Sequence, residues 1–472
     1  MKRFLDFTAS PYFNSNKSVV RLAAQLKKYH PDFQEHLIKK EKLYDKIFSG
    51  EKYNDQVMRN LSSQLLKLAK EFIAIDLYNN DEIRKSLDFL SEANMRRLDA
   101  LFTSERKALK NILQKEKLDE ALFLQLHTLE EIDVQFKLHR DRQKEVFESL
   151  ASEGNYLIYY FLIRLNDIYV NMKINEDALN ADIDREFVKV FFEKIDFQNL
   201  INFLEQNNIK YGSIFTLYYY RMMCILNPDD SEHYHNLYNL LLKTMSVLKN
   251  AEVSQLMGTL EFVCTYKINR GDRSFYKDLF GLYDLERKYK LGHYAPGRII
   301  TSFRFRNTVL VALRVGEVDW AYDYIKNYKK YLNKENKELA DFGMAMINFE
   351  RGEYEKSIEA LRSIKTDYSM IKVDMKYLLV KSFYELGYDE AVISQLNSFR
   401  HLVTSHKEVT DITREKGLNF INLTNSLIKL KDDPDKERAD ELLDRINTLN
   451  LTGDKVWLEK KINDITNKKT AI

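Results

Sequence analysis

The sequence predicts an all-α protein, a right-handed α-solenoid of antiparallel helix pairs preceded by an N-terminal helical domain. Only 14 of its 472 residues are Gly and 5 are Pro, whereas β-rich folds need both residues for their many tight turns. Apolar residues recur three or four positions apart over long stretches, which is the spacing of one face of an α-helix. A short motif also repeats at an interval typical of stacked helical hairpins.

Three regions differ in composition, and we place domain boundaries between them. Residues 1–95 contain short helices and form the N-terminal helical domain. Residues 96–153 lack Gly and Pro and are rich in Lys, Glu, Gln and Leu, which predicts long, solvent-facing connecting helices. Residues 154–472 form the repeat array, with Gly at its connections. The periodicity indicates roughly seventeen helices in all.

Two helices show the extremes of this pattern. The first carries one apolar stripe, made of Leu118, Leu122, Leu126, Leu129, Ile132 and Phe136. The second, over residues 156–170, is apolar on every side except at Arg164, Asn166 and Asp167. A helix that is apolar all round needs cover on several faces, so we expect the second one inside the array.

An internal repeat is clearest over residues 302–405. The segment from Gly316 to Ala321 recurs 36 positions later, beginning at Gly352. It recurs again from Gly387 to Ala391, where the copy reads as one residue shorter. Each copy lies between two apolar helices, so Gly allows the sharp turn and the small residue after it allows close packing. No hairpin of this kind hides its own apolar faces, so we expect the pairs to stack.

The period and the placing of the Gly and small residues resemble the tetratricopeptide repeat. The resemblance implies a concave groove lined by the first helix of each pair. Phe305 and Val309 stand where that family more often has other residues, so the array is tetratricopeptide-like and departs from the consensus.

The full chain also resembles a group of helical proteins of Bacteroidota that have no assigned activity. The likeness lies in Ser10–Asn14, in Tyr29–Phe33, in Gly50–Asp55 and in Asn419–Ile421. The likeness therefore supplies no activity for this chain.

Bulk properties exclude several classes of protein. The net charge is only +2, which argues against bulk binding to nucleic acid or to an anionic membrane. The longest uncharged apolar run, residues 156–163, is too short to span a membrane. Cys224 and Cys264 lie apart without a metal-ligand spacing, and two scattered thiols suit a reducing compartment. We therefore expect a cytoplasmic protein.

No catalytic, cofactor or metal motif stands out, and we predict no enzyme activity and no cofactor. His233 and His235 are the closest histidine pair, but two residues apart on a helix they point in different directions and cannot share one ion. Glu130 and Asp133 are neighbouring carboxylates, which we interpret as part of an exposed helix face without a catalytic role.

A basic stretch over residues 287–314 is the most unusual charge feature, because it holds seven Lys or Arg residues and no acidic one. Tetratricopeptide geometry would turn some of its arginines, with residues of a later repeat, toward the groove. The candidate partner-binding residues are Arg306, Arg314, Tyr377, Lys381 and Tyr384. Such a set suits an acidic or C-terminal peptide. The alternative that these side chains pair with nearby Asp and Glu stays open.

The leading hypothesis is a non-enzymatic scaffold that binds a protein or peptide through the concave groove. The alternative is a nucleic-acid-associated protein that uses the basic stretch over 287–314 and the N-terminal helices. In the N-terminal helices, the residues that would contact nucleic acid are Lys27, Lys28, Lys39, Lys40 and Lys42.

Overall fold

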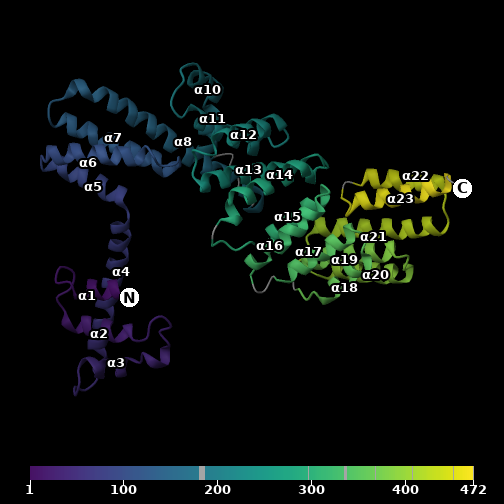
Figure 1. Ribbon diagram of the computed structural model, residues 1–472, viewed down its shortest axis with the longest axis horizontal. Coiled ribbons are helices and arrows are strands. Elements are labelled where there is room, and N and C mark those ends of the chain that lie inside the picture. The colour runs from purple at the N-terminus through teal and green to yellow at the C-terminus, as the bar shows by residue number, and fades with distance from the viewer. Residues whose placement is uncertain are drawn as a thin grey trace. The chain divides into compact units, whose positions relative to one another are not determined.

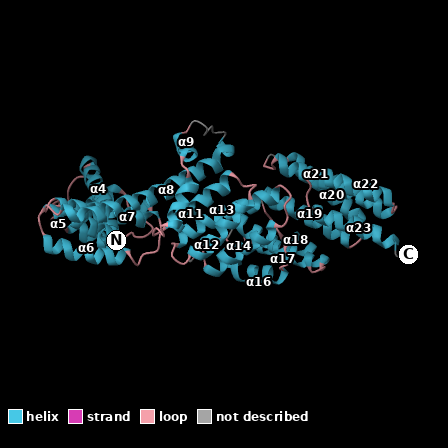
Figure 2. Ribbon diagram, turned by 90° about the horizontal axis from the view of Figure 1, so that it is seen from above, coloured by secondary structure: helices cyan, strands magenta, loops and turns pink. Residues whose placement is uncertain are grey.

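The computed structural model describes residues 1–179, 186–295, 297–333, 337–366, 368–406, 408–449 and 451–470. Within these ranges the chain forms helices α1 to α23 with a few short 3-10 turns, and no strand occurs among them (Figure 2). The all-α prediction is confirmed, and the helices of the described ranges are more numerous than expected. The chain divides into two compact units, Met1–Ile168 and Tyr169–Ile472.

The first unit begins with four helices that share one apolar core. They are α1 (Lys2–Ala9), α2 (Lys17–Lys27), α3 (Lys40–Ile47) and α4 (Asp55–Asn80). Val19 and Leu22 are buried at the centre of this core, and Met58 and Leu61 contribute from α4. The side chain of Asn54 caps α4 by accepting a hydrogen bond from the backbone N–H of Val57 at 3.2 Å, which satisfies a donor that the helix itself leaves free.

Four more helices complete the first unit. They are α5 (Glu82–Met95), α6 (Asp99–Leu113), α7 (Glu120–Leu138) and α8 (Val146–Leu179), of which the part after Ile168 belongs to the second unit. The predicted boundary between residues 153 and 154 therefore falls inside α8. The stripe that begins at Leu118 lies mostly on α7, where Leu122, Leu126 and Leu129 are buried.

The expectation that residues 156–170 are covered on several faces is wrong. This stretch is the middle of α8, and it buries Tyr159 and Ile163 on one side. On the other side Leu157, Ile158 and Phe161 are between 43% and 53% exposed. Apolar residues all round a helix indicate how much it could bury, and only tertiary packing decides how much of it is covered.

The second unit contains α9 to α23, and Figure 1 shows these helices from teal to yellow. The first six are α9 (Phe187–Lys194), α10 (Phe197–Gln206), α11 (Gly212–Leu226), α12 (Ser231–Thr244), α13 (Asn250–Asn269) and α14 (Phe275–Tyr289). The repeat region follows as α15 (Ser302–Arg314), α16 (Val318–Tyr328), α17 (Glu338–Glu350), α18 (Tyr354–Ser363), α19 (Ser369–Glu385) and α20 (Asp389–Ser405). The last three are α21 (Asp411–Asp432), α22 (Lys436–Thr448) and α23 (Lys455–Thr470).

Neighbouring helices of the repeat region contact one another in chain order. Helix α15 contacts α16 and α17, and α17 in turn contacts α18 and α19. One apolar core runs through these helices and continues into α21, α22 and α23. Helix α23 contacts both α21 and α22, beside which it lies in Figure 1.

The three repeated turns share one backbone geometry. Gly316, Gly352 and Gly387 have φ values of +85°, +77° and +75°, a region that favours glycine. In each turn the N–H after the Gly reaches a carbonyl five residues back, as Glu317 N–H does to Ala312 O at 2.9 Å. This bond satisfies carbonyls that the preceding helix leaves free.

The interpretation of the third copy as one residue shorter is wrong. Tyr388 N–H bonds to Phe383 O at 3.0 Å, so the turn at Gly387 has the same register as the other two. The position five residues after the Gly is therefore Val392, which is fully buried, and Ala391 is only half-buried. In the first two copies the same position holds the buried residues Ala321 and Ser357.

Close packing between repeats predicts the effect of adding a side chain at Gly343 in α17. A Cβ there would lie 2.6 Å from Cδ1 of Ile325, a buried residue of α16. We expect Gly343→Val to lower the free energy of unfolding by about 1–3 kcal/mol, because overpacking forces neighbours off their preferred rotamers. Urea denaturation followed by circular dichroism measures this change.

The control is Gly258→Ala, also within a helix, where a Cβ would meet nothing within 4 Å. We expect this substitution to raise the free energy of unfolding by up to about 1 kcal/mol, because Ala is the better helix former. Equal effects of the two substitutions would contradict the close approach of α16 and α17.

Candidate functional site

The five candidate groove residues come from two helices. Arg306 and Arg314 lie on α15, and Tyr377, Lys381 and Tyr384 lie on α19. The three residues of α19 are four and three positions apart, so they share one face of that helix. We call these five residues the basic–aromatic face.

A stretch of the chain's own C-terminal region lies against this face. We call residues 451–457, which lead from the end of α22 into the first turn of α23, the C-terminal segment. Asp454, at the centre of this segment, forms ion pairs with both Lys381 and Arg314. The distance from Lys381 Nζ to Asp454 Oδ2 is 2.7 Å. The structure therefore brings α15 and α19 together around one carboxylate.

The Asp454 carboxylate is nearly inaccessible, with 9% of its side chain exposed. Burial acts to raise its pKa, but the charges of Lys381 and Arg314 outweigh burial and hold the pKa well below its usual range. The pKa of Arg314 is raised in turn, chiefly by the charge of Asp454. Asp454 is therefore ionised at neutral pH and acts as the counter-ion of both cations.

Aromatic contacts hold the rest of the C-terminal segment. The ring of Trp457 meets the ring of Tyr384 edge-on, with centroids 5.2 Å apart. Trp457 Nε1–H donates a hydrogen bond to Glu385 Oε1 at 2.8 Å. Tyr377 lies where a Cβ on Gly453 would be, so only glycine fits at that position. Four of the five candidate residues thus contact the segment directly.

Arg306, the fifth residue, contacts α19 instead. Its guanidinium forms an ion pair with Asp374, one turn before Tyr377. Burial raises the pKa of Asp374, although the charge of Arg306 opposes that change. The pair connects α15 to α19 beside the contacts that Asp454 makes.

Two other arginines of the 287–314 stretch, Arg287 and Arg304, also meet carboxylates. Arg287 lies 2.7 Å from Asp284. Arg304 is buried between Glu261, at 2.5 Å, and Glu286. Burial raises the pKa of Glu286 to about 7, against the charge of Arg304. With Arg306 and Arg314 these pairs neutralise four of the stretch's cations, which is the arrangement that the sequence left open as an alternative.

The carboxylates Glu130 and Asp133 are not exposed, contrary to expectation. Both are buried on α7 and meet cations from several elements. Arg106 Nε lies 2.6 Å from Asp133, and Lys137 lies 2.8 Å from the same carboxylate. Their charge is balanced within the first unit, so they serve its packing.

The remaining candidates do not assemble a reactive centre. No group of three or more metal-ligating side chains occurs within the described ranges, and His233 lies beside Asp230 at 3.5 Å. Burial raises the pKa of Cys224 and Cys264 to about 12, so both thiols stay protonated at neutral pH. Among the described helices, none is long and apolar enough to cross a membrane.

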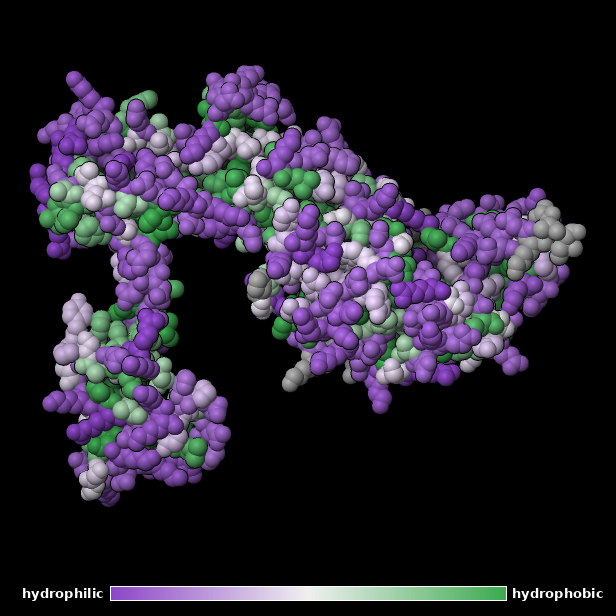
Figure 3. Space-filling model, in the orientation of Figure 1, coloured by the Kyte–Doolittle hydropathy of each residue, from purple (hydrophilic) through white to green (hydrophobic). Residues whose placement is uncertain are grey.

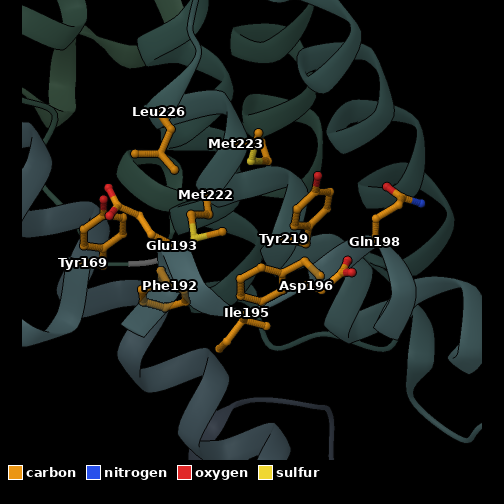
Figure 4. A pocket seen from close by; sticks show the side chains of 11 residues that line it. Tyr169, Phe192, Glu193, Ile195, Asp196, Gln198, Tyr219, Met222, Met223 and Leu226 are labelled. Atoms are coloured by element: carbon orange, nitrogen blue, oxygen red, sulfur yellow. The ribbon is translucent and has the colours of Figure 1, made fainter. Parts of the chain in front are cut away.

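A cleft of about 280 Å³ opens between α9, α10 and α11. Figure 4 shows the rings of Tyr169, Phe192 and Tyr219 and the side chains of Met222 and Met223 around it. Figure 3 shows hydrophobic surface beside the same helices. A selective ligand site also needs convergent polar groups, but the carboxylate and amide side chains that line this cleft already have partners within the chain. Asp196 caps α10 by accepting from the Asn199 N–H at 3.1 Å, Gln198 donates to Asn202 at 3.1 Å, and Glu193 lies 3.8 Å from Lys189. The basic–aromatic face is therefore a better candidate for a binding site than this cleft.

The sequence grouped five residues that the structure brings close together, and it missed the segment that lies against them. Helical spacing grouped the residues of the basic–aromatic face, but the clearest repeats end at residue 405, well before Asp454 and Trp457. The missed signal was Gly453 followed by a helix on which Trp457, Leu458, Ile462 and Ile465 fall near one face.

Comparison with family models, with curated proteins and with solved structures finds no match to this chain.

The two ion pairs of Asp454 predict a pH-dependent contribution to stability. We expect Asp454→Asn to lower the free energy of unfolding at pH 7 by about 2–3 kcal/mol, because two cations lose their counter-ion. The cost is smaller than that of breaking a fully buried pair, because Arg314 is 39% exposed and solvent screens its charge. Urea denaturation at pH 7, 5, 4 and 3 measures the difference.

The sign follows from the lowered pKa of Asp454. The stability that Asp454 contributes is complete above its unfolded pKa and is lost as pH falls toward its folded pKa. The gap between wild type and Asp454→Asn should therefore shrink below about pH 4. Asp319→Asn is the control, because that carboxylate is 95% exposed beside Arg351 and should cost nothing measurable. A gap independent of pH would contradict the ionised pair.

Proposed function

We propose that this chain is a non-enzymatic scaffold whose tetratricopeptide-like solenoid binds a protein partner through the basic–aromatic face. In this proposal α15, α17, α19 and α21 are the first helices of successive pairs and line the concave groove. The partner presents an acidic segment to that groove.

The observation that supports the proposal most strongly is that Asp454 forms ion pairs with both Arg314 and Lys381. Arg314 and Lys381 come from helices two pairs apart and converge on one carboxylate. Charge-assisted pairs of this kind are among the strongest hydrogen bonds that a protein surface offers to a peptide. A surface that holds an acidic segment of its own chain has the chemistry to hold one from a partner.

The contacts between successive helix pairs support the solenoid arrangement. Each described pair in the repeat region contacts the next, and one apolar core continues through all of them. Stacked pairs that share a continuous core are the arrangement from which solenoids derive their extended binding surfaces.

The charge state of Asp454 supports ion pairing over proton transfer at that carboxylate. Asp454 is held by Lys381 and Arg314. A general acid or base needs a proton that moves near neutral pH, whereas the lowered pKa of Asp454 keeps it ionised.

Charge reversal on the face tests the proposal. We expect the variant Arg314→Glu/Lys381→Glu to lose a partner that the wild-type chain retains in affinity capture from the host cell. The loss should be about tenfold or more, because two attractive contacts to a carboxylate become repulsive. Quantitative mass spectrometry of the captured proteins measures it.

The matched control is Lys326→Glu, which reverses one charge at an exposed position of α16, the second helix of its pair. This variant should capture the same partner as wild type. The proposal fails if the double variant captures the same proteins in the same amounts, or if no protein is enriched by any of the three chains.

One observation favours the nucleic-acid alternative for the N-terminal helices. The five lysines predicted for it, Lys27, Lys28, Lys39, Lys40 and Lys42, are all exposed. Lys46 joins them by donating a hydrogen bond to Tyr29 Oη at 2.8 Å. That bond lowers the pKa of Tyr29, with smaller contributions from the charges of Lys28 and Lys42. The Lys46 ammonium also lies 5.4 Å from the centre of the Tyr29 ring, and a cation beside an aromatic ring is a feature of surfaces that bind single-stranded nucleic acid.

Salt dependence decides this alternative. If the lysines bind phosphates, Lys28→Glu/Lys42→Glu/Lys46→Glu should reduce the slope of log affinity against log salt by about 3, because each phosphate contact releases roughly one counterion. Fluorescence anisotropy with mixed oligonucleotides between low and high salt measures the slope. A full-length chain that binds no oligonucleotide at low salt excludes this function.

A further inference from the structure

The C-terminal segment combines two features that a partner of the basic–aromatic face would need. It carries a carboxylate at Asp454 and a large aromatic ring three residues later at Trp457. We propose that this segment is a built-in competitor, and that the partner displacing it carries the same pattern, a Gly-Asp pair followed by an aromatic residue at the spacing of Trp457. This inference rests on the proposed function, because it names the partner and the regulation of the same face.

The ion pairs of Asp454 explain why the C-terminal segment leaves the face only when another carboxylate replaces that of Asp454. Lys381 is almost fully buried, and its ammonium lies 2.7 Å from Asp454 and 4.7 Å from the centre of the Phe349 ring. A buried cation without a counter-ion is strongly unfavourable. Asp454 is therefore released readily only when another carboxylate takes its place between Lys381 and Arg314.

The position before the carboxylate fixes the shape of the segment. A side chain on Gly453 would collide with Tyr377, whose ring packs edge-on against Phe399 and Phe420 at 4.8 and 4.7 Å. Because the Tyr377 ring is packed between Phe399 and Phe420, it has no room to adopt another rotamer. A competing segment therefore needs glycine immediately before its acidic residue.

The aromatic position adds a directed hydrogen bond to the packing of the ring. Trp457 contacts Tyr384 and Phe420, and its Nε1–H donates to Glu385. Trp combines a large apolar face with one donor, which is why it is common at the centre of binding interfaces. We expect Trp at this place in the partner.

The exchange is confined to a short stretch of the chain. Leu458 and Ile462 are fully buried in the shared core, and α23 contacts α21 and α22. Lys461 also pairs with Glu385 at 2.7 Å. These contacts belong to α23 beyond its first turn, so α23 stays with α22 while residues 451–457 move away.

A peptide added in trans tests the competition. The probe is a fluorescein-labelled peptide with the sequence of residues 451–462, and the receptors are full-length chains. Gly453→Ala pushes the resident segment away from Tyr377 but leaves the basic–aromatic face intact. We expect this variant to bind the peptide about tenfold or more tightly than wild type does, as measured by fluorescence anisotropy.

Two controls make the result specific. Gly258→Ala makes the same substitution where a Cβ has open space, and it should bind the peptide no better than wild type. The same peptide carrying Asp454→Ala should bind none of the chains. A second released receptor, Asp454→Ala/Trp457→Ala, should bind the unaltered peptide as tightly as Gly453→Ala does.

Each contrary outcome overturns the proposal. It fails if both released receptors keep the wild-type circular dichroism spectrum yet bind no peptide, or if wild type binds as well as they do. It also fails if neither released receptor folds, because the segment is then a structural part of the array. Dimers of Gly453→Ala, detected by light scattering, would assign the face to a second copy of this chain.

The peptide result and the partner-capture result are independent. A folded Gly453→Ala variant without peptide binding removes the built-in competitor and leaves the scaffold function in place. Capture that is unchanged in Arg314→Glu/Lys381→Glu removes the scaffold function itself.

Discussion

The carboxylate of Asp454 is the constraint on which the rest of the C-terminal half depends. Arg314 and Lys381 point toward one place from two helices, and neither is stable there without a negative charge. That charge comes from a residue 140 positions after Arg314. The geometry of the repeats and the location of the C-terminal segment are therefore coupled, because each supplies what the other needs. The basic–aromatic face, for which we propose a partner, is already occupied when the chain is folded.

The sequence predicts the local part of this structure well, because local chemistry decides it. Gly316, Gly352 and Gly387 mark turns whose positive φ values few other residues adopt. The apolar spacing identifies the helices on either side. The register of the third copy was the exception, because a match by residue type chose Ala391 where the backbone places Val392. Hydrogen-bond geometry fixes that register, and side-chain size alone does not.

The non-local part of the site could not be predicted for a physical reason. Helical spacing tells which residues share a face, and it correctly grouped Tyr377, Lys381 and Tyr384 on α19. It does not tell what covers that face, because Arg306 meets Asp374 across 68 positions and Arg314 meets Asp454 across 140. The same limit applies to α8, where helical spacing did not show that Leu157 and Ile158 would stay exposed while Tyr159 and Ile163 are buried.

The coupling between Asp454 and Lys381 tests the central claim most directly. A double-mutant cycle with Asp454→Ala and Lys381→Met, followed by urea denaturation of the full-length chain, isolates the energy of that pair. The account predicts that the two losses are far from additive, with a coupling of about 1–3 kcal/mol. Losses that add within about 0.3 kcal/mol would show that the two side chains do not depend on each other. The basic–aromatic face would then have no resident occupant.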